Sequence, residues 1–400
     1  MMRISERSKK APASPIRKLV PFAEEAVKKG KKIYYLNIGQ PDIPTPSIYF
    51  QYEEKHRPQI VAYTHSAGLL PLREAFTKYY ARFDIDVFPD EIIVTNGGSE
   101  AVLFAMTVVA DPGDEILVLE PFYANYAGFA AQLGINLVPV RTRPEDGYQI
   151  PKMGDFLEKI SHRTKAIIFS NPCNPTGAVY DEKQLEVIAE VALKRDLFVI
   201  SDEVYREFTF DGFRAISMMS FSNISDKVIV VDSISKRYSA CGARIGTFIT
   251  KNKDIYQAAM KLAQARLCPA MTSQYGTIGL LTLDDLYYSQ MRKEYEMRRD
   301  VVYEELQRID GAVFKKPHGA FYISVKLPID NSEDFVKFML TEYEVEGKTT
   351  MVAPLSGFYV TPSTGMSEIR IAYVLEREQL RDAVAILTSG LKTYIERRNK

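Results

Sequence analysis

Between about Glu91 and Thr250, short apolar runs rich in β-branched residues alternate with longer segments of helical periodicity. Runs this apolar are typical of strands buried on both faces of a mostly parallel sheet, with helices such as 182–194 covering it. The runs are 92–95, 116–119, 137–140, 166–170, 197–201, 228–231 and 247–250. The sequence therefore predicts an α/β fold with a mostly parallel seven-stranded sheet, in which ligands bind at the carboxyl ends of the strands.

The rest of the chain is sufficient for a second, smaller α/β domain. A charged segment of helical periodicity, 284–309, is predicted to form a connecting helix. Strands are expected near 320–326 and 369–373, and helices near 333–343 and 376–397. Because 400 residues exceed what one hydrophobic core usually serves, we predict a large ligand-binding domain over 45–290. A small domain over 1–44 and 291–400 would include an N-terminal arm.

Charge and cysteine content restrict the partners and the compartment. The chain has 51 basic and 51 acidic side chains, so no net field would gather nucleic acid or an anionic membrane, and the expected partner is a small molecule. No apolar run approaches the roughly 20 residues that span a bilayer. Three cysteines, Cys173, Cys241 and Cys268, are too few for a disulfide framework, and the N-terminus lacks a secretory signal. We expect a cytoplasmic protein, and we predict no metal site.

Lys236 lies just beyond the strand 228–231, where a side chain would face the ligand crevice. A partly desolvated lysine beside another cation can lose its proton and act as the amine nucleophile of Schiff-base chemistry. Arg244 is a candidate for that cation and for gripping a phosphate, and Ser233 and Ser235 add hydroxyls for the same anion. The alternative is that Lys236 and Arg244 are solvated surface charges, as most basic residues are.

A glycine-rich turn, with Gly98, Ser99 and Glu100, joins the strand 92–95 to an amphipathic helix that runs to about Val109. Glycines allow close approach of the backbone to a ligand, and the amides at a helix N-terminus bind phosphate. The alternative is an ordinary corner in which Ser99 is only the N-cap of the helix.

Asp202 ends the strand 197–201, and Tyr205 follows it. A carboxylate in a shielded crevice needs a cationic partner, which a protonated pyridine nitrogen would supply, while the tyrosine could bond a phenolic oxygen of the same ring. Alternatively, Asp202 only caps a following helix and Tyr205 is an ordinary buried tyrosine.

Three further residues are candidates on weaker grounds. Asn174 lies in a turn with two Asn-Pro bonds, which fix an unusual backbone and suggest a cis peptide; the alternative is a surface turn. Tyr123 could stack on a flat ligand or belong to the core. Arg370 could grip a carboxylate if its face of the strand 369–373 looks into the cleft, and it is a solvated charge if that face looks outward.

Together these segments resemble fold type I pyridoxal-phosphate enzymes, specifically the class I aminotransferase family with its aspartate and aromatic aminotransferases. The resemblance covers nearly the whole chain, from about Ser14 to Arg397. The order of the motifs carries it: an NIGQPD segment containing Gly39, Tyr63 before G-x-x-x-L-R, the glycine turn, an aromatic residue, N-P-x-N-P-T-G, D-E-x-Y, S-x-S-K and a late arginine.

The resemblance implies pyridoxal 5′-phosphate as the cofactor, held by Lys236 as an internal aldimine. It implies that Asp202 pairs with the pyridine nitrogen, that Tyr205 and Asn174 contact the ring oxygen, and that Tyr123 stacks on the ring. Lys236, Asp202 and Tyr205 would then be the catalytic residues, with Lys236 moving the α-proton.

The same resemblance implies the remaining contacts. The phosphate of the cofactor would be bound by Ser99, Ser233 and Arg244, and Gly98 and Glu100 would also belong to the cofactor site. Gly39, Asn174 and Arg370 would form the substrate carboxylate site. Tyr63 would reach the phosphate in the neighbouring subunit, which implies a homodimer with shared sites.

The expected reaction moves the amino group of an α-amino acid to 2-oxoglutarate, with aspartate favoured as donor and an aromatic amino acid second. Arg17 or Lys18, in the N-terminal segment, could meet a dicarboxylic side chain. Two departures leave the side-chain pocket open: Cys241 stands where relatives often have a small hydroxyl residue, and 355–359 differs from the usual P-G-S-x-F-G loop.

Two other functions compete with this one. A carbon–sulfur β-lyase of the same fold would use the same lysine and eliminate from the β-carbon. A cofactor-binding regulator would need an added DNA-binding domain, and the residues before Ser14 are too few for a helix-turn-helix.

Overall fold

A computed structural model describes residues 4–398; residues 1–3 and 399–400, which the predicted small domain also included, lie outside the described part. The seven predicted strands are all present, with small shifts at their ends, so the predicted α/β class is confirmed. They are β2 (Ile92–Thr95), β3 (Glu115–Glu120), β4 (Asn136–Arg141), β5 (Thr164–Ser170), β6 (Phe198–Asp202), β7 (Val228–Ser233) and β8 (Gly246–Ile249).

The strands form one sheet in the order β2-β8-β7-β6-β5-β3-β4, in which only β8 runs antiparallel to its neighbours. Alternate side chains enter two different cores: Ile167 and Val199 lie in one, Ile168 and Ile200 in the other. The expected burial on both faces is therefore confirmed. The exception is β4, which is partly exposed and contains Pro139, as suits an edge strand.

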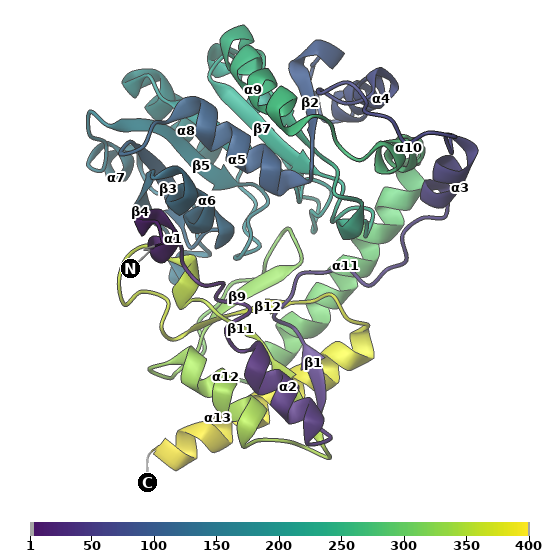
Figure 1. Ribbon diagram of the computed structural model, residues 1–400. Helices are drawn as coiled ribbons and strands as arrows, with labels where there is room; N and C mark the ends of the chain where they lie inside the picture. Colours follow the sequence, from purple (N-terminus) through teal and green to yellow (C-terminus); the bar gives the residue numbers. More distant parts are fainter. Residues whose placement is uncertain (1–3, 399–400) are drawn as a thin grey trace.

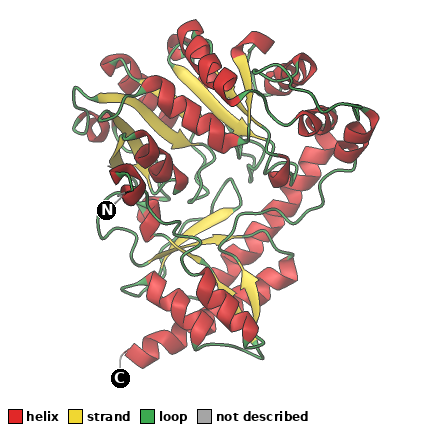
Figure 2. Ribbon diagram, viewed as in Figure 1, coloured by secondary structure: helices red, strands yellow, loops and turns green. Residues whose placement is uncertain are grey.

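Helices cover both faces of this sheet (Figures 1 and 2). The core on one face includes side chains of α5 (Gly98–Val109), α6 (Asn125–Leu133) and α9 (Lys253–Arg266). The core on the other face includes side chains of α3 (Ile48–Lys55), α4 (Leu70–Ala81), α8 (Glu182–Arg195) and α10 (Met271–Leu280). The predicted helix 182–194 is thus α8, which begins where Asp181 accepts a hydrogen bond from the Gln184 amide. The short α7 (Met153–Leu157) packs on α8.

The second region also follows the predicted order of elements. The long helix α11 (Asp285–Leu306) runs from the large sheet into this region (Figure 1). It is followed by β9 (Tyr322–Lys326), α12 (Ser332–Thr341), β10 (Lys348–Met351), β11 (Ala353–Pro354), β12 (Glu368–Ala372) and α13 (Arg377–Arg398). Strands β11, β12 and β9 form an antiparallel sheet, while β10 pairs in parallel with β1 (Lys32–Tyr35).

The N-terminal segment contacts both regions. Helix α2 (Val20–Lys28) packs on α12, whereas α1 (Glu6–Lys10) packs on α6 of the large sheet. A third core joins α2, β1, α11, α12 and α13, and it also takes in the side chains of Tyr205 and Phe208. We propose the domain boundaries 1–44 with 291–400 and 45–290 on this separation of cores. No helix within residues 4–398 is both long and apolar enough to cross a membrane.

Candidate active site

Five of the predicted site segments lie at one edge of the large sheet. Strands β2, β3, β5, β6 and β7 all point the same way, so their carboxyl ends meet there. The predicted residues at or just beyond these ends are Gly98, Tyr123, Asn174, Asp202 and Lys236. The sheet topology alone therefore brings these residues to the same edge of the sheet.

The Lys236 side chain is half-buried, and its Nζ donates a hydrogen bond to the Gly39 carbonyl at 2.7 Å. Cys241 Sγ lies 3.9 Å from the same nitrogen. The interpretation of Lys236 as a solvated surface charge is therefore wrong, whereas Arg244 is exposed, as the same interpretation expected. A Cβ on Gly39 would overlap the Tyr322 hydroxyl, so glycine is needed for this segment to come so close.

A cradle for an anion lies at the start of α5. The helix is capped by Gly97, at φ 78°, so the interpretation of Ser99 as the N-cap is wrong. The amides of Gly98 and Ser99 have no acceptor within residues 4–398. The Arg244 guanidinium occupies the place that a Cβ of Gly97 would need. Two free amides, a helix N-terminus and a guanidinium together suit a phosphate.

The other predicted members of the cradle are held in place by neighbours. Ser233 lies beside Gly98, and its Oγ is 2.8 Å from Ser235 Oγ and 3.1 Å from the Ile245 carbonyl. The Glu100 carboxylate accepts from the Asn96 amide at 2.8 Å and from Arg266 at 2.9 Å. The Glu100 side chain thus stabilises the turn at Asn96–Gly98.

Asp202 is buried without a cationic partner among the described residues. Tyr126 donates a hydrogen bond to it at 2.6 Å, and the Val204 amide does so at 3.3 Å. Burial raises the pKa of Asp202 to about 6, against the lowering by these two bonds. Because residues 204–207 form a turn, the interpretation of Asp202 as a helix cap is wrong.

Arg370, on β12, is 1% exposed, so its interpretation as an outward, solvated charge is wrong. Its Nη1 donates to Asn174 Oδ1 at 2.9 Å and its Nη2 donates to the Asn37 carbonyl at 2.7 Å. Its Nε is buried with no partner in the described chain. Asn171-Pro172 and Asn174-Pro175 are cis, as suggested, but the turn is buried and is not a surface turn.

Two tyrosines join these groups, and their roles were not predicted. The Arg370 guanidinium carbon lies 4.2 Å from the centre of the Tyr322 ring. The Tyr322 hydroxyl is 2.8 Å from the Tyr205 hydroxyl. Tyr126 contacts both Asp202, through its hydroxyl, and Tyr123, through its ring. The two tyrosine rings are edge-on, with their centres 5.5 Å apart. Burial, with smaller contributions from Tyr322 and Asp202, raises the pKa of Tyr123 to about 12.

Comparison with known proteins agrees with this geometry. The profile of the family described as "Aminotransferase class I and II" matches residues 31–387. The chain belongs to this family. Curated relatives include the aspartate aminotransferases of Thermotoga maritima, 30% identical over 95% of this chain and 97% of the relative, and of Pyrococcus abyssi, 32% identical over 96% and 97%. An alanine aminotransferase structure from Pyrococcus furiosus superposes with a TM-score of 0.90 at 35% identity, covering 98% of this chain and all of that one.

The protein is thus a pyridoxal-phosphate-dependent aminotransferase that acts on amino acids and oxo acids. Its residues fit the cofactor. The buried Asp202 has no cation beside it within residues 4–398, and a protonated pyridine nitrogen would supply one, while the cradle of α5 with Arg244 suits the phosphate. The predicted family and cofactor are confirmed.

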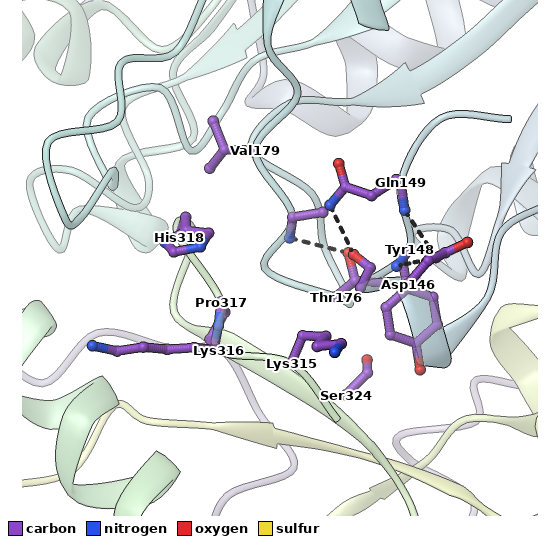
Figure 3. A pocket seen from close by; sticks show the side chains of 12 residues that line it. Asp146, Tyr148, Gln149, Thr176, Val179, Lys315, Lys316, Pro317, His318 and Ser324 are labelled. Atoms are coloured by element: carbon purple, nitrogen blue, oxygen red, sulfur yellow. Dashed lines mark hydrogen bonds between the residues drawn. The ribbon is translucent and has the colours of Figure 1, made fainter. Parts of the chain in front are cut away.

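Three predicted residues of the aminotransferase lie outside this cluster. Tyr63 is 79% exposed, and Arg17 is also exposed. Lys18 forms an ion pair with Glu333 of α12, so it is directed to that helix. A pocket of about 220 Å³, lined by Tyr148, Thr176, Lys315 and Ser324 among others, likewise contains none of the predicted site residues (Figure 3).

The raised pKa of Asp202 predicts a pH-dependent stability of the cofactor-free aminotransferase. The folded state holds this proton more tightly than the unfolded chain does, so the stabilisation is present below pH 3.8 and is lost as the pH rises through about 6. A pKa difference of about 2 corresponds to about 3 kcal/mol. Asp202→Asn should therefore unfold at higher urea than the wild type at pH 7, and the two should converge near pH 4. A difference that is the same at both pH values would contradict this origin.

Proposed function

We propose that this aminotransferase moves the amino group of aspartate to 2-oxoglutarate, with an aromatic amino acid as the second candidate donor. The observation that carries the proposal is the buried Arg370 beside Asn174, whose Nε has no partner among the described residues and could donate to an α-carboxylate. The choice of aspartate rests on the names of relatives, which also include an aromatic-amino-acid aminotransferase of Thermococcus litoralis, 30% identical over 98% of this chain and 99% of the relative.

Lys236 is proposed to carry the cofactor and then, as a free amine, to take the α-proton and return it. Its hydrogen bond to the Gly39 carbonyl must break first, because the same nitrogen has to bond to the cofactor. Bound pyridoxal 5′-phosphate supplies an electron-poor ring that stabilises the negative charge left at the α-carbon. Asp202 is proposed to keep the proton on the ring nitrogen, and Tyr126 to keep Asp202 oriented.

The remaining residues are proposed to bind and orient. Arg370, Asn174 and Gly39 hold the substrate carboxylate, and Tyr205 with Asn174 meets the ring oxygen. Tyr123 stacks on the ring. On the phosphate, Gly98 and Ser99 donate their amides, with Ser233 and Arg244. Glu100 positions the Asn96–Gly98 turn, since its carboxylate is already bound to Asn96 and Arg266.

A panel of amino donors tests the function. The loss of visible absorbance on mixing the holoenzyme with aspartate, alanine, tyrosine or cystathionine measures the first half-reaction, and glutamate formed with 2-oxoglutarate measures the second. We expect aspartate to react fastest. Alanine reacting at least tenfold faster would replace the proposed donor.

The same panel addresses the carbon–sulfur β-lyase. Cystathionine that yields pyruvate rapidly without any oxo acid would favour elimination over amino transfer. Pyruvate formed only with an acceptor present, or not at all, would leave transamination as the activity.

A shared-site dimer predicts complementation between two defective variants. The residues Ile60, Val61 and Tyr63 are each more than 70% exposed, which suits a segment covered by a second subunit. Mixing Lys236→Ala with Tyr63→Ala under subunit exchange should restore activity, because each mixed dimer regains one intact site. About one quarter of all sites would then be intact. Activity equal to the average of the separate variants would place Tyr63 in its own subunit's site or outside any site.

A further inference from the structure

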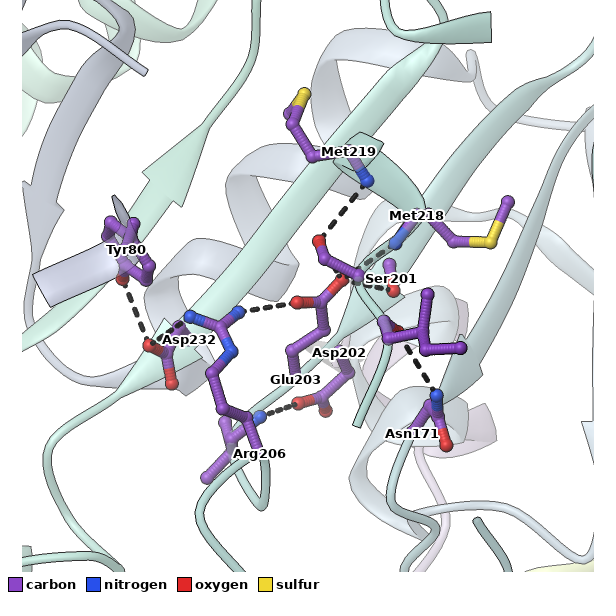
Figure 4. A network of polar contacts seen from close by, with 12 residues as sticks. Tyr80, Asn171, Ser201, Asp202, Glu203, Arg206, Met218, Met219 and Asp232 are labelled. Atoms are coloured by element: carbon purple, nitrogen blue, oxygen red, sulfur yellow. Dashed lines mark hydrogen bonds and ion pairs between the residues drawn. The ribbon is translucent and has the colours of Figure 1, made fainter. Parts of the chain in front are cut away.

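A buried network of charged groups contacts the turn that carries Lys236. Figure 4 shows part of it, where Arg206 lies between Glu203 and Asp232, with Tyr80 beside Asp232. Asp232 is 0% exposed and Arg237 is 1% exposed. Such ion pairs often add little net stability, because desolvating both charges costs about as much as their attraction returns. Their placement therefore calls for another reason.

Three hydrogen-bond donors and one further arginine surround the Asp232 carboxylate at the end of β7. Its Oδ1 accepts from the Ser233 amide at 2.6 Å and from Arg237 Nη1 at 2.8 Å. Its Oδ2 accepts from the Tyr80 hydroxyl at 2.9 Å and lies 3.6 Å from Arg206 Nη1. Burial alone would raise the pKa of Asp232, but the two arginines lower it below its usual value. The carboxylate is therefore ionised across the working range of pH.

Arg237 binds back to the start of the turn, which runs from Ser233 to Arg237. The same Nη1 that meets Asp232 also donates to the Ser233 carbonyl at 3.1 Å. Both main-chain polar groups of Ser233 are thus bound by one ion pair. Arg237 is also the immediate neighbour of Lys236, so the pair spans the segment from the phosphate-side serine to the lysine.

Resting on the function proposed above, we propose that the Asp232–Arg237 ion pair is a positioning device for Lys236 and Ser233. It fixes the turn before the cofactor arrives, so that the amine and the phosphate donors already have the required separation. Neither residue is among the proposed contacts of the cofactor. The Lys236 amine condenses with the cofactor aldehyde, forming a carbon–nitrogen double bond and releasing water, and this step is slowed when the turn relaxes.

The test measures how fast pyridoxal 5′-phosphate attaches to the cofactor-free protein, from its visible absorbance, together with the pH midpoint of that absorbance and the melting temperature. Asp232→Asn and Arg237→Met are expected to slow attachment on the order of 10²-fold and to shift the midpoint. Arg237→Lys, which keeps the charge, should recover part of the rate. Glu207→Gln is the matched control: its carboxylate lies in the same network but bonds Tyr79 and Arg292 instead of the turn.

The outcomes separate three cases. Attachment at the wild-type rate and midpoint in both Asp232→Asn and Arg237→Met, with only the melting temperature lowered, overturns the inference. Equal slowing in Glu207→Gln overturns it as well, because the effect would belong to the whole network. A wild type that never attaches the cofactor ends the proposed function, and the inference with it. Should Arg237→Met fail to fold, the near-isosteric Asp232→Asn and the charge-conserving Arg237→Lys decide.

Discussion

Replacing Lys236 with alanine is expected to lower the turnover number by at least about 10⁴-fold. The variant loses the amine proposed to carry the cofactor and the base proposed to move the α-proton, and general acid–base catalysis alone contributes about 10²- to 10⁴-fold. The fold should survive, because the side chain is half-buried and its shortest polar contact is the Gly39 carbonyl. Steady-state kinetics and thermal melting of the same preparation measure the two effects.

Lys261→Ala provides the matched control for this variant. Lys261 lies on an exposed position of α9, so its removal should leave both rate and stability unchanged. Reduction with borohydride should fix the cofactor on the wild type and on Lys261→Ala, but not on Lys236→Ala. A Lys236→Ala protein that keeps more than about one tenth of the activity would remove this residue from the mechanism.

Replacing Arg370 with leucine is expected to lower kcat/KM for an amino acid donor by about 30- to 5000-fold. This range corresponds to the 2–5 kcal/mol lost when one partner of a buried, hydrogen-bonded charge pair is removed. The kcat/KM of Arg370→Lys should lie between those of the wild type and Arg370→Leu. An ammonium keeps the charge but cannot contact both carboxylate oxygens as the planar guanidinium does. Initial rates at low donor concentration give the ratio directly.

Arg370 also supports Asn174 and the Asn37 carbonyl, so its role in binding must be separated from its role in the fold. An amine that lacks the carboxylate serves as the reference donor. If Arg370 binds the carboxylate, the leucine variant should lose rate with the amino acid and keep it with the amine. An equal loss with both donors would point to a structural role only.

The apolar runs predicted the large sheet well because a strand buried on both faces carries its signal in its own residues. Strand β7 is one example, with every residue buried. The site residues at or just beyond the ends of such strands, Asp202 and Lys236, could be located for the same reason. The family resemblance supplied their chemical roles.

Contacts between distant segments could not be obtained in this way. Alternation along β12 gave Arg370 two possible directions, and only the packing of the 171–177 turn against that strand decides between them. The pairing of Lys18 with Glu333 and the bond from Tyr126 to Asp202 depend on how separate elements meet. The residues next to each of these side chains in the sequence carry no pattern that indicates its distant partner.

Two main-chain carbonyls of the short stretch from Asn37 to Gly39 accept hydrogen bonds from different side chains. The Asn37 carbonyl accepts from Arg370 and the Gly39 carbonyl accepts from Lys236. Carbonyls belong to every residue type, so this link depends on chain length more than on side-chain identity. Exchanging Ile38, which is 45% exposed, leaves both acceptors where they are. Inserting a single residue would instead move one acceptor relative to the other, and would uncouple the group that receives the carboxylate from the amine that performs the chemistry.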